Sequence, residues 1–349
     1  MTYNNLKYSL LFSFILSACS SGDRLEPDEM TGLPAPPQHF PAMPEVDYNP
    51  MTKDGVVLGR KLFFEPLMSG NNKISCASCH HQDKAFTDGV SLSSIGFSGN
   101  RLHRNTQAII NLAWATNGLF WEGGSTNLES LAIGPITHLD EMGQNVLELP
   151  QKLERSGHYK LLFENAFPSE KSEGITTQKI LKALGQYLRT IVSADSRYDQ
   201  YILGKLSLTD REQRGLTVFD TKCASCHSRD KHLFTDNLYH NIGLDDTFSE
   251  ANERVEQGRY RITFNPDDMG KFRTPTLRNI SYTAPYMHDG RFGTLEEVLD
   301  HFQHGIRHTA TTSPYLSGFT LSDVEKDLLQ VFLKTLDDEA FVTNPALRP

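Results

Sequence analysis

The chain has few cysteines, and its sequence leaves none for a disulfide. Of its five cysteines, four lie in two copies of the pentapeptide CASCH, at Cys76–His80 and Cys223–His227, and the fifth is Cys19 near the N-terminus. A disulfide framework is therefore excluded as a source of stability.

Clustered basic residues are also missing. The chain carries 34 Lys and Arg against 43 Asp and Glu, a formal net charge of -9. A surface that binds phosphates needs clustered cations, so a nucleic-acid partner is excluded. The composition, with 38% hydrophobic and 22% charged residues, is that of a folded globular protein.

No long hydrophobic run is present at the N-terminus. The apolar stretch from Leu10 to Leu16 is too short to span a bilayer, so it predicts a removable export signal over residues 1–18. Leu16-Ser17-Ala18-Cys19 resembles the bacterial lipobox, which implies a lipid on Cys19, although an ordinary signal peptide is the alternative. Ser20 after the cysteine indicates the outer membrane, with the lipid as the only membrane contact.

The segment after Cys19 is rich in proline. Seven prolines lie between Pro27 and Pro50, and such a stretch is stiff and irregular. We expect residues 19–50 to form a tether that does not pack.

The rest of the chain contains an internal repeat. The segment from Leu58 to Asp88 and the segment from Gly215 to Asp236 each join a helix-like stretch, a CASCH motif and a similar following loop, which indicates a duplicated domain. Helical patterns dominate, with a helix expected after Thr176. Capping boxes are expected where a Ser or Thr precedes a Glu by three residues, at Thr209 and Glu212, Thr294 and Glu297, and Ser322 and Glu325.

This organisation predicts a mainly α fold with two cytochrome c-like domains, over residues 51–206 and 207–340, joined by long loops. In C-x-x-C-H the two thiols add to the vinyl groups of a haem, and the histidine binds its iron. A zinc site would need further ligands at close spacing, and a thioredoxin-like site would need a βαβ pattern. The motifs therefore predict two covalent c-type haems, held by Cys76, Cys79 and His80 and by Cys223, Cys226 and His227.

Further segments resemble the bacterial di-haem cytochrome c peroxidase family, which includes MauG. The resemblance extends over roughly residues 50 to 340. It rests on Leu58-Gly59-Arg60-Lys61-Leu62-Phe63-Phe64, the first CASCH, Arg104-Asn105-Thr106, Phe120-Trp121-Glu122-Gly123-Gly124, Pro135-Ile136, Glu141-Met142-Gly143, Thr274-Pro275-Thr276-Leu277-Arg278-Asn279 and Ala284-Pro285-Tyr286-Met287-His288-Asp289-Gly290.

This resemblance implies distinct roles for the two haems. The N-terminal haem, with His80 as its proximal ligand, would be peroxidatic, and Glu141 would be the distal carboxylate that moves a proton between the peroxide oxygens. Trp121 would relay electrons between the haems, whereas Trp114 is expected to be a core residue. His227 would be the proximal ligand of the electron-transferring haem.

The resemblance also implies a calcium ion near the domain interface. Its ligands would be the Asn105 side chain and the backbone carbonyls of Thr283 and Pro285, since calcium prefers hard oxygen ligands. Family members are often dimers, so a homodimer is a further implication.

Two positions depart from the family pattern. Where classical members carry a histidine that closes the resting N-terminal iron, this chain has Phe97, so we expect that iron to be open, as in MauG-like members. Where a Met or Tyr would ligate the second iron, the chain has Phe302. His301, His304, Met287 or no residue remain open as alternatives.

Three functions compete. The first is an exported periplasmic peroxidase that reduces hydrogen peroxide with electrons from a small cytochrome c or cupredoxin. The second is a MauG-like enzyme that uses peroxide to oxidise Trp or Tyr residues on a partner protein. The third is a non-enzymatic di-haem electron carrier, for which the Glu141 segment would have no purpose.

Overall fold

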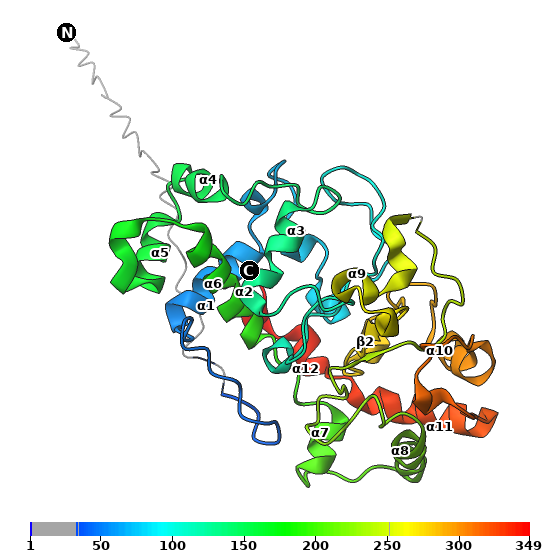
Figure 1. The fold of residues 1–349 in the computed structure, drawn as a ribbon. Coiled ribbons are helices and arrows are strands. Elements are labelled where there is room, and N and C mark those ends of the chain that lie inside the picture. Colours follow the sequence, from blue (N-terminus) through cyan, green and yellow to red (C-terminus); the bar gives the residue numbers. More distant parts are fainter. Residues whose placement is uncertain (2–32, 34, 251) are drawn as a thin grey trace.

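A computed structural model describes residues 1, 33, 35–250 and 252–349 of the chain (Figure 1). The expected signal peptide and the lipidation site at Cys19 lie outside these residues. Within the part that is described, no helix is long and apolar enough to cross a membrane.

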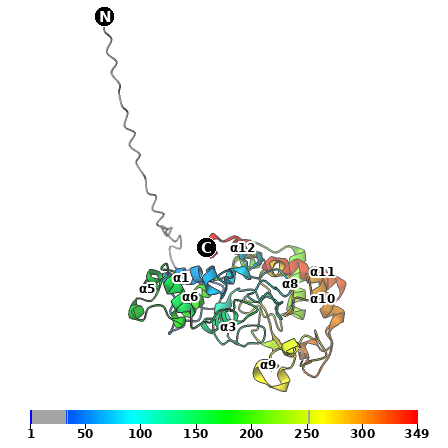
Figure 2. The same ribbon diagram turned by 90° about the horizontal axis from the view of Figure 1, so that it is seen from above.

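The fold is mainly helical, as predicted, and two helix pairs organise it. Helix α1 (Lys53–Phe63) packs against α6 (Thr177–Thr190), and α8 (Asp210–Lys222) packs against α11 (Asp323–Leu333). Seen from above, α1, α5 (Lys160–Ala166) and α6 gather at one end of the molecule (Figure 2). Helices α8, α10 (Leu295–Asp300) and α11 gather at the other end, so the two halves of the sequence form two halves of the molecule.

A glycine at the same place in each repeat allows each pair to pack closely. A Cβ atom on Gly59 of α1 would lie 2.0 Å from the carbonyl oxygen of Ala183, and one on Gly215 of α8 would lie 2.2 Å from that of Leu328. Both distances are far below van der Waals contact, so only glycine permits these helix crossings. In both pairs, the helix that carries the glycine precedes a CASCH motif in the sequence.

Local sequence signals fix where the helices begin. The side chain of Thr176 caps α6 by accepting a hydrogen bond from the Lys179 backbone. All three predicted capping boxes are present, at the starts of α8, α10 and α11. Because each box satisfies backbone N–H groups that the first helical turn leaves free, the cap and the apolar stripe behind it specify one starting point.

The remaining elements are short. The helices are α2 (Leu128–Leu131), α3 (Ile133–Thr137), α4 (Leu149–Arg155), α7 (Arg197–Ile202), α9 (Tyr260–Thr263) and α12 (Glu339–Thr343). Strands β1 (Tyr239–His240) and β2 (Phe272–Arg273) pair antiparallel, with Tyr239 opposite Arg273 and His240 opposite Phe272. A π-helical turn over His301–Gly305 follows α10.

Two main hydrophobic cores lie under the two halves, and their limits differ slightly from the predicted ones. Tyr198 of α7 belongs to the second core, which therefore begins before residue 207. The C-terminal arm crosses back, because Phe341 and Leu347 pack in the first core. The Tyr187 hydroxyl donates to the Leu347 carbonyl at 3.0 Å, so the arm ties the halves together.

The expectation that residues 19–50 do not pack is wrong for the end of this segment. Phe40 is buried against Trp114, with their rings edge to face at 5.2 Å, and the Trp114 indole donates to the Pro41 carbonyl. His39 is hydrogen-bonded to the buried Asp199 at 2.9 Å. Phe40 and His39 thus anchor the end of this segment. Its prolines alone would favour a tether without contacts to the fold.

Candidate functional site

The first CASCH motif opens onto a cavity in the N-terminal half. Cys76, Cys79 and His80 line this cavity of about 460 Å³. The Nδ1 atom of His80 is hydrogen-bonded to the Phe86 carbonyl at 2.7 Å, which orients the ring and leaves Nε2 for a metal. Burial lowers the pKa of His80 and so favours the neutral imidazole that a metal ligand requires.

The second motif repeats this arrangement. Cys223, Cys226 and His227 line a cavity of about 260 Å³, and His227 Nδ1 is hydrogen-bonded to the Phe234 carbonyl at 3.1 Å. Phe86 and Phe234 both have positive φ angles, 60° and 54°. The same uncommon backbone conformation therefore presents the orienting carbonyl in both copies of the repeat.

These two donor sets fit a covalently attached haem. Burial raises the pKa of Cys76, Cys79 and Cys223 to about 12, so these side chains are neutral thiols. Each motif offers two thiols, an imidazole held in one orientation and a cavity lined mostly by apolar side chains. That is the chemistry by which c-type cytochromes hold an iron porphyrin.

The two cavities share one wall. Seven residues line both cavities, and we call them the shared wall: Asn105, Thr106, Gln107, Ala108, Leu112, Trp121 and Arg273. The Trp121 indole donates to the Asn105 carbonyl at 2.9 Å, which fixes the ring within this wall. The structure thus places Trp121 between the CASCH sites, whereas Trp114 lines only the second cavity.

Glu141 lies on the first cavity together with His80. Its backbone is held in a tight turn after α3, where its N–H donates to the His138 carbonyl and its carbonyl accepts from Phe97. Among the described residues, none is seen to donate a hydrogen bond to its carboxylate. Burial raises the pKa of Glu141, the neighbouring His138 opposes this shift and Asp140 adds to it. A buried carboxyl with a raised pKa can both accept and return a proton.

Phe97 does not enter the first cavity. Its ring lies over Gly143, where an added Cβ would come within 2.5 Å of it, and the side chain is 42% exposed. Backbone hydrogen bonds from Phe97 to Glu141 and from Ser98 to Leu139 hold this loop in place. The position expected from the sequence to match the closing histidine therefore carries a residue that does not line this cavity, whose lining includes His103 and His138 besides His80.

The second cavity has Phe302 and Met287 in its lining, but neither His301 nor His304. The imidazole of His301 is hydrogen-bonded to the Ile242 carbonyl at 2.9 Å. His304 is exposed. Of the ligands left open by the sequence, only Met287 is brought to the cavity.

Two of the three proposed calcium ligands are in contact. The Asn105 side chain is hydrogen-bonded to the Pro285 carbonyl at 2.6 Å, and both residues line the second cavity with Thr283. If the Asn105 side-chain amide is flipped, its oxygen takes the place of its nitrogen and lies next to the same Pro285 carbonyl. The arrangement can therefore offer two oxygens to one cation.

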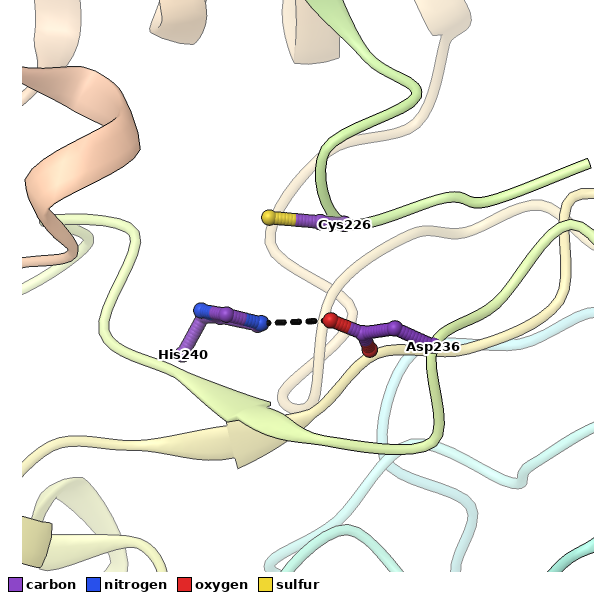
Figure 3. Close-up of side chains that lie close together, drawn as sticks. All are labelled: Cys226, Asp236 and His240. Atoms are coloured by element: carbon purple, nitrogen blue, oxygen red, sulfur yellow. Dashed lines mark hydrogen bonds and ion pairs between the residues drawn. The ribbon is translucent and has the colours of Figure 1, made fainter.

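Sequence reasoning missed a polar cluster beside the second motif. His240 is hydrogen-bonded to Asp236 at 2.8 Å, and both lie close to the Cys226 sulfur (Figure 3). Burial opposes a charge on this imidazole, but the hydrogen bond that it donates to Asp236 and the adjacent Cys226 raise the pKa of His240 to about 9. The thiol, carboxylate and imidazole of this cluster could together hold a metal. If Cys226 is joined to a haem by a thioether, however, it has no thiolate to offer. The spacing of four residues between Asp236 and His240 was the available signal.

The first repeat has no counterpart to this cluster. Asp88 corresponds to Asp236, but it accepts a hydrogen bond from Thr106, and residue 92 is leucine where the second repeat has His240. The surroundings of the two CASCH motifs are therefore different, with Glu141 near one and His240 near the other.

The fold and the two cavities fit a haem-binding protein, and comparison with known proteins identifies its family. The sequence model described as "Di-haem cytochrome c peroxidase" matches residues 53–207. The chain is 34% identical over 343 residues to "Methylamine utilization protein MauG" of Methylorubrum extorquens, covering 96% of this chain and 94% of the relative. It is 33% identical over 330 residues to "Cytochrome-c peroxidase IdrP1" of a Pseudomonas species, covering 85% and 84%.

A solved structure agrees with these relatives. The crystal structure of a MauG-like protein associated with microbial copper homeostasis superposes with a TM-score of 0.79 at 36% identity, covering 89% of this chain and 97% of that one. The chain belongs to the di-haem cytochrome c peroxidase family, and it is a peroxidase-type oxidoreductase with haem cofactors.

Proposed function

We propose that the chain is an exported di-haem peroxidase that reduces hydrogen peroxide to water at the cavity of His80 and Glu141. One observation carries the proposal: this cavity shares a wall containing Trp121 with the cavity of His227. A site for peroxide, a proton-transferring carboxyl and a second redox centre are thereby joined in one molecule. The overall reaction consumes one peroxide, two electrons and two protons and yields two waters.

The roles of the residues follow from their contacts. Cys76 and Cys79 would hold a haem whose iron His80 binds, and this haem would supply the redox chemistry of O–O cleavage. Glu141 accepts the proton of one peroxide oxygen and returns it to the other, which makes water the leaving group. Its burial supports this role, because a raised pKa brings the carboxyl closer to working pH.

Electrons enter at the second centre in this proposal. Cys223 and Cys226 would hold the second haem, with His227 as its proximal ligand, and Trp121 in the shared wall would relay the electrons. The donor would be a small periplasmic cytochrome c or cupredoxin. Several relatives are named as cytochrome-c peroxidases, which supports a donor of this kind.

The wider setting is also part of the proposal. Residues 1–18 would be removed, a lipid on Cys19 would anchor the protein at the periplasmic face of the outer membrane, and the chain up to residue 38 would act as the tether. Residues 51–206 and 207–340 would form the peroxidatic and electron-transferring haem domains, except that Tyr198 packs in the second core and Phe341 and Leu347 pack in the first. A calcium ion held by Asn105, Thr283 and Pro285 would brace their junction, and two copies would associate as a homodimer.

A second function is favoured by the position of Phe97. Because this residue does not line the cavity, we propose that the His80 iron is open at rest and that neither His103 nor His138, the other two histidines in the cavity lining, binds it. That state suits MauG-like, peroxide-dependent oxidation of Trp or Tyr residues on a partner protein. A di-haem electron carrier is less well supported, since a carrier needs no buried carboxyl beside an open iron.

Turnover measurements separate these functions. The purified holoprotein is mixed with hydrogen peroxide and a reduced small cytochrome c, and oxidation of the cytochrome is followed optically. A peroxidase gives rapid turnover without prior reduction of the protein. A MauG-like enzyme gives slow turnover and a long-lived oxidised state of both haems. A protein that contains both haems but shows no peroxide-dependent oxidation would rule out both enzymes.

A further inference from the structure

Arg273 is a buried cation in the shared wall. Only 7% of this residue is exposed. Its backbone N–H donates to the Trp121 carbonyl at 2.8 Å, and its Nε atom donates to the Phe120 carbonyl at 3.2 Å. Within the described parts of the chain, no carboxylate forms an ion pair with its guanidinium. Most of its five N–H donors are therefore left without a protein acceptor.

Other buried arginines in this protein are neutralised. The guanidinium of Arg278 is paired with Asp199 at 2.7 Å, and that of Arg189 is paired with Glu129 at 2.8 Å. A buried charge without a partner is strongly unfavourable, and proteins pair or remove it. Arg273 thus departs from the pattern of its own fold, and the missing anion has to come from outside the chain.

A second orphaned donor lies in the same wall. The side-chain nitrogen of Gln107 is buried and has no hydrogen-bond partner. Like Arg273, Gln107 lines both cavities. Two residues of the shared wall thus carry donors that lack protein acceptors, one of them charged, and an acceptor that would suit both is a carboxylate or a similar anion.

Haem carries such anions. Its vinyl groups are consumed by the cysteines of the CASCH motifs, and its two propionate carboxylates are its only negatively charged side groups. Resting on the haem attachment of the proposed function, we propose that Arg273 and Gln107 form a carboxylate-binding pair that holds a propionate from each haem. The planar guanidinium suits this role because the N–H groups of its two Nη atoms remain available to two carboxylates.

A cation shared by two haems links their redox properties. A positive charge near a haem favours the ferrous form, so Arg273 would raise both midpoint potentials together. Lys222 offers a contrast, because it is a cation that lines only the second cavity. Its ammonium donates to the Thr320 carbonyl at 2.7 Å and lies 3.7 Å from Glu325.

The test compares Arg273→Met with Lys222→Gln in the holoprotein. Both midpoint potentials are measured by spectroelectrochemistry, and the haem content is measured by the pyridine haemochrome assay. For Arg273→Met we expect the ratio of ferrous to ferric haem at fixed potential to fall about tenfold at both centres, which is about 59 mV for each one-electron couple. For Lys222→Gln we expect any shift to be confined to the second haem.

Resonance Raman spectra give a readout that a purely structural role would not move. The low-frequency bending modes of the propionates report their hydrogen bonding, so Gln107→Leu should shift these modes while both haems remain attached. Arg273→Lys keeps the charge without the planar fork, and it should restore most of the potential but not the wild-type modes. These two milder variants keep the test open if Arg273→Met does not fold.

Unchanged modes in Gln107→Leu, or a potential shift at only one haem in the Arg273 variants, would overturn the proposal of a shared pair. Failure of the proposed function gives a different result. A wild-type protein without haem, or with two haems and no peroxide chemistry, contradicts the function whatever these variants do. Two attached haems with wild-type potentials in Arg273→Met contradict only the carboxylate-binding pair.

Discussion

Replacing Glu141 with glutamine tests the proposed division of labour most sharply. Glutamine keeps the size and shape of the side chain, so the turn that links residue 141 to His138 and Phe97 should be preserved. It cannot accept a proton from peroxide. The substitution therefore removes one chemical function from the cavity and leaves the cavity itself in place.

The expected loss of activity is large. A positioned acid–base group typically contributes roughly 10²–10⁴-fold to a rate, which corresponds to about 3–5 kcal/mol of transition-state stabilisation. We expect kcat/KM for peroxide to fall by this factor. Because the carboxylate receives no hydrogen bond from the described residues, the loss should reflect proton transfer, with little contribution from a broken structural contact.

The same substitution should stabilise the protein at neutral pH. Burial raises the pKa of Glu141 above its ordinary value of 4.5, so the folded state keeps a proton that the unfolded state has released. Stability therefore falls as pH rises between the ordinary and the raised pKa. Glutamine carries no charge, so burying it does not have this cost. The variant should therefore be more stable than the wild type above the raised pKa, and this difference should be absent below pH 4.5.

Two assays on one pair of proteins decide the matter. Peroxide-dependent oxidation of a reduced cytochrome gives kcat/KM, and thermal unfolding at pH 4 and pH 7 gives the stability difference. A loss of less than about tenfold in kcat/KM for Glu141→Gln, well below the usual acid–base contribution, would rule out Glu141 as the proton-transferring group. A stability gain of equal size at both pH values would show that Glu141 is not held as a buried, raised-pKa carboxyl.

Three further predictions follow from the same structure. Asp199→Asn should leave Arg278 buried without its partner and cost about 3–5 kcal/mol, measured by denaturant unfolding; a cost below about 1 kcal/mol would contradict the buried pair. Trp121→Phe should slow electron transfer between the haems in stopped-flow experiments, whereas Trp114→Phe should lower stability and leave that rate unchanged; equal rates in both variants would remove Trp121 from the path. Chelation of calcium should reduce turnover in the wild type but not in Asn105→Ala, and a wild type without bound calcium by elemental analysis would contradict that site.

Local signals account for the part of the fold that the sequence predicted. Helix starts at Thr209, Thr294 and Ser322 depend on a hydrogen-bond exchange across three residues, so the pattern is complete in the sequence. The CASCH motifs are equally local. Their duplication predicted two haem-attachment sites, and the carbonyls of Phe86 and Phe234 hold the two histidines alike.

The missed features depend on contacts between distant segments. His240 lies near the second motif in a strand, β1, that pairs with β2. Strands of two residues are too short for their pairing to be predicted from the sequence. Phe40 packs on Trp114 across more than seventy residues, where the prolines dominate the local pattern. The lack of an ion-pair partner for Arg273 cannot be predicted from the sequence, because it depends on where the fold places the surrounding carboxylates.

In our proposal the two CASCH motifs hold haems with different tasks, and the electron paramagnetic resonance spectrum of the ferric holoprotein distinguishes two such centres. We predict a high-spin signal from an open iron at His80 that is lost within one turnover when peroxide is added, and that persists in Glu141→Gln under the same conditions. Two low-spin signals that peroxide leaves unchanged would contradict the account.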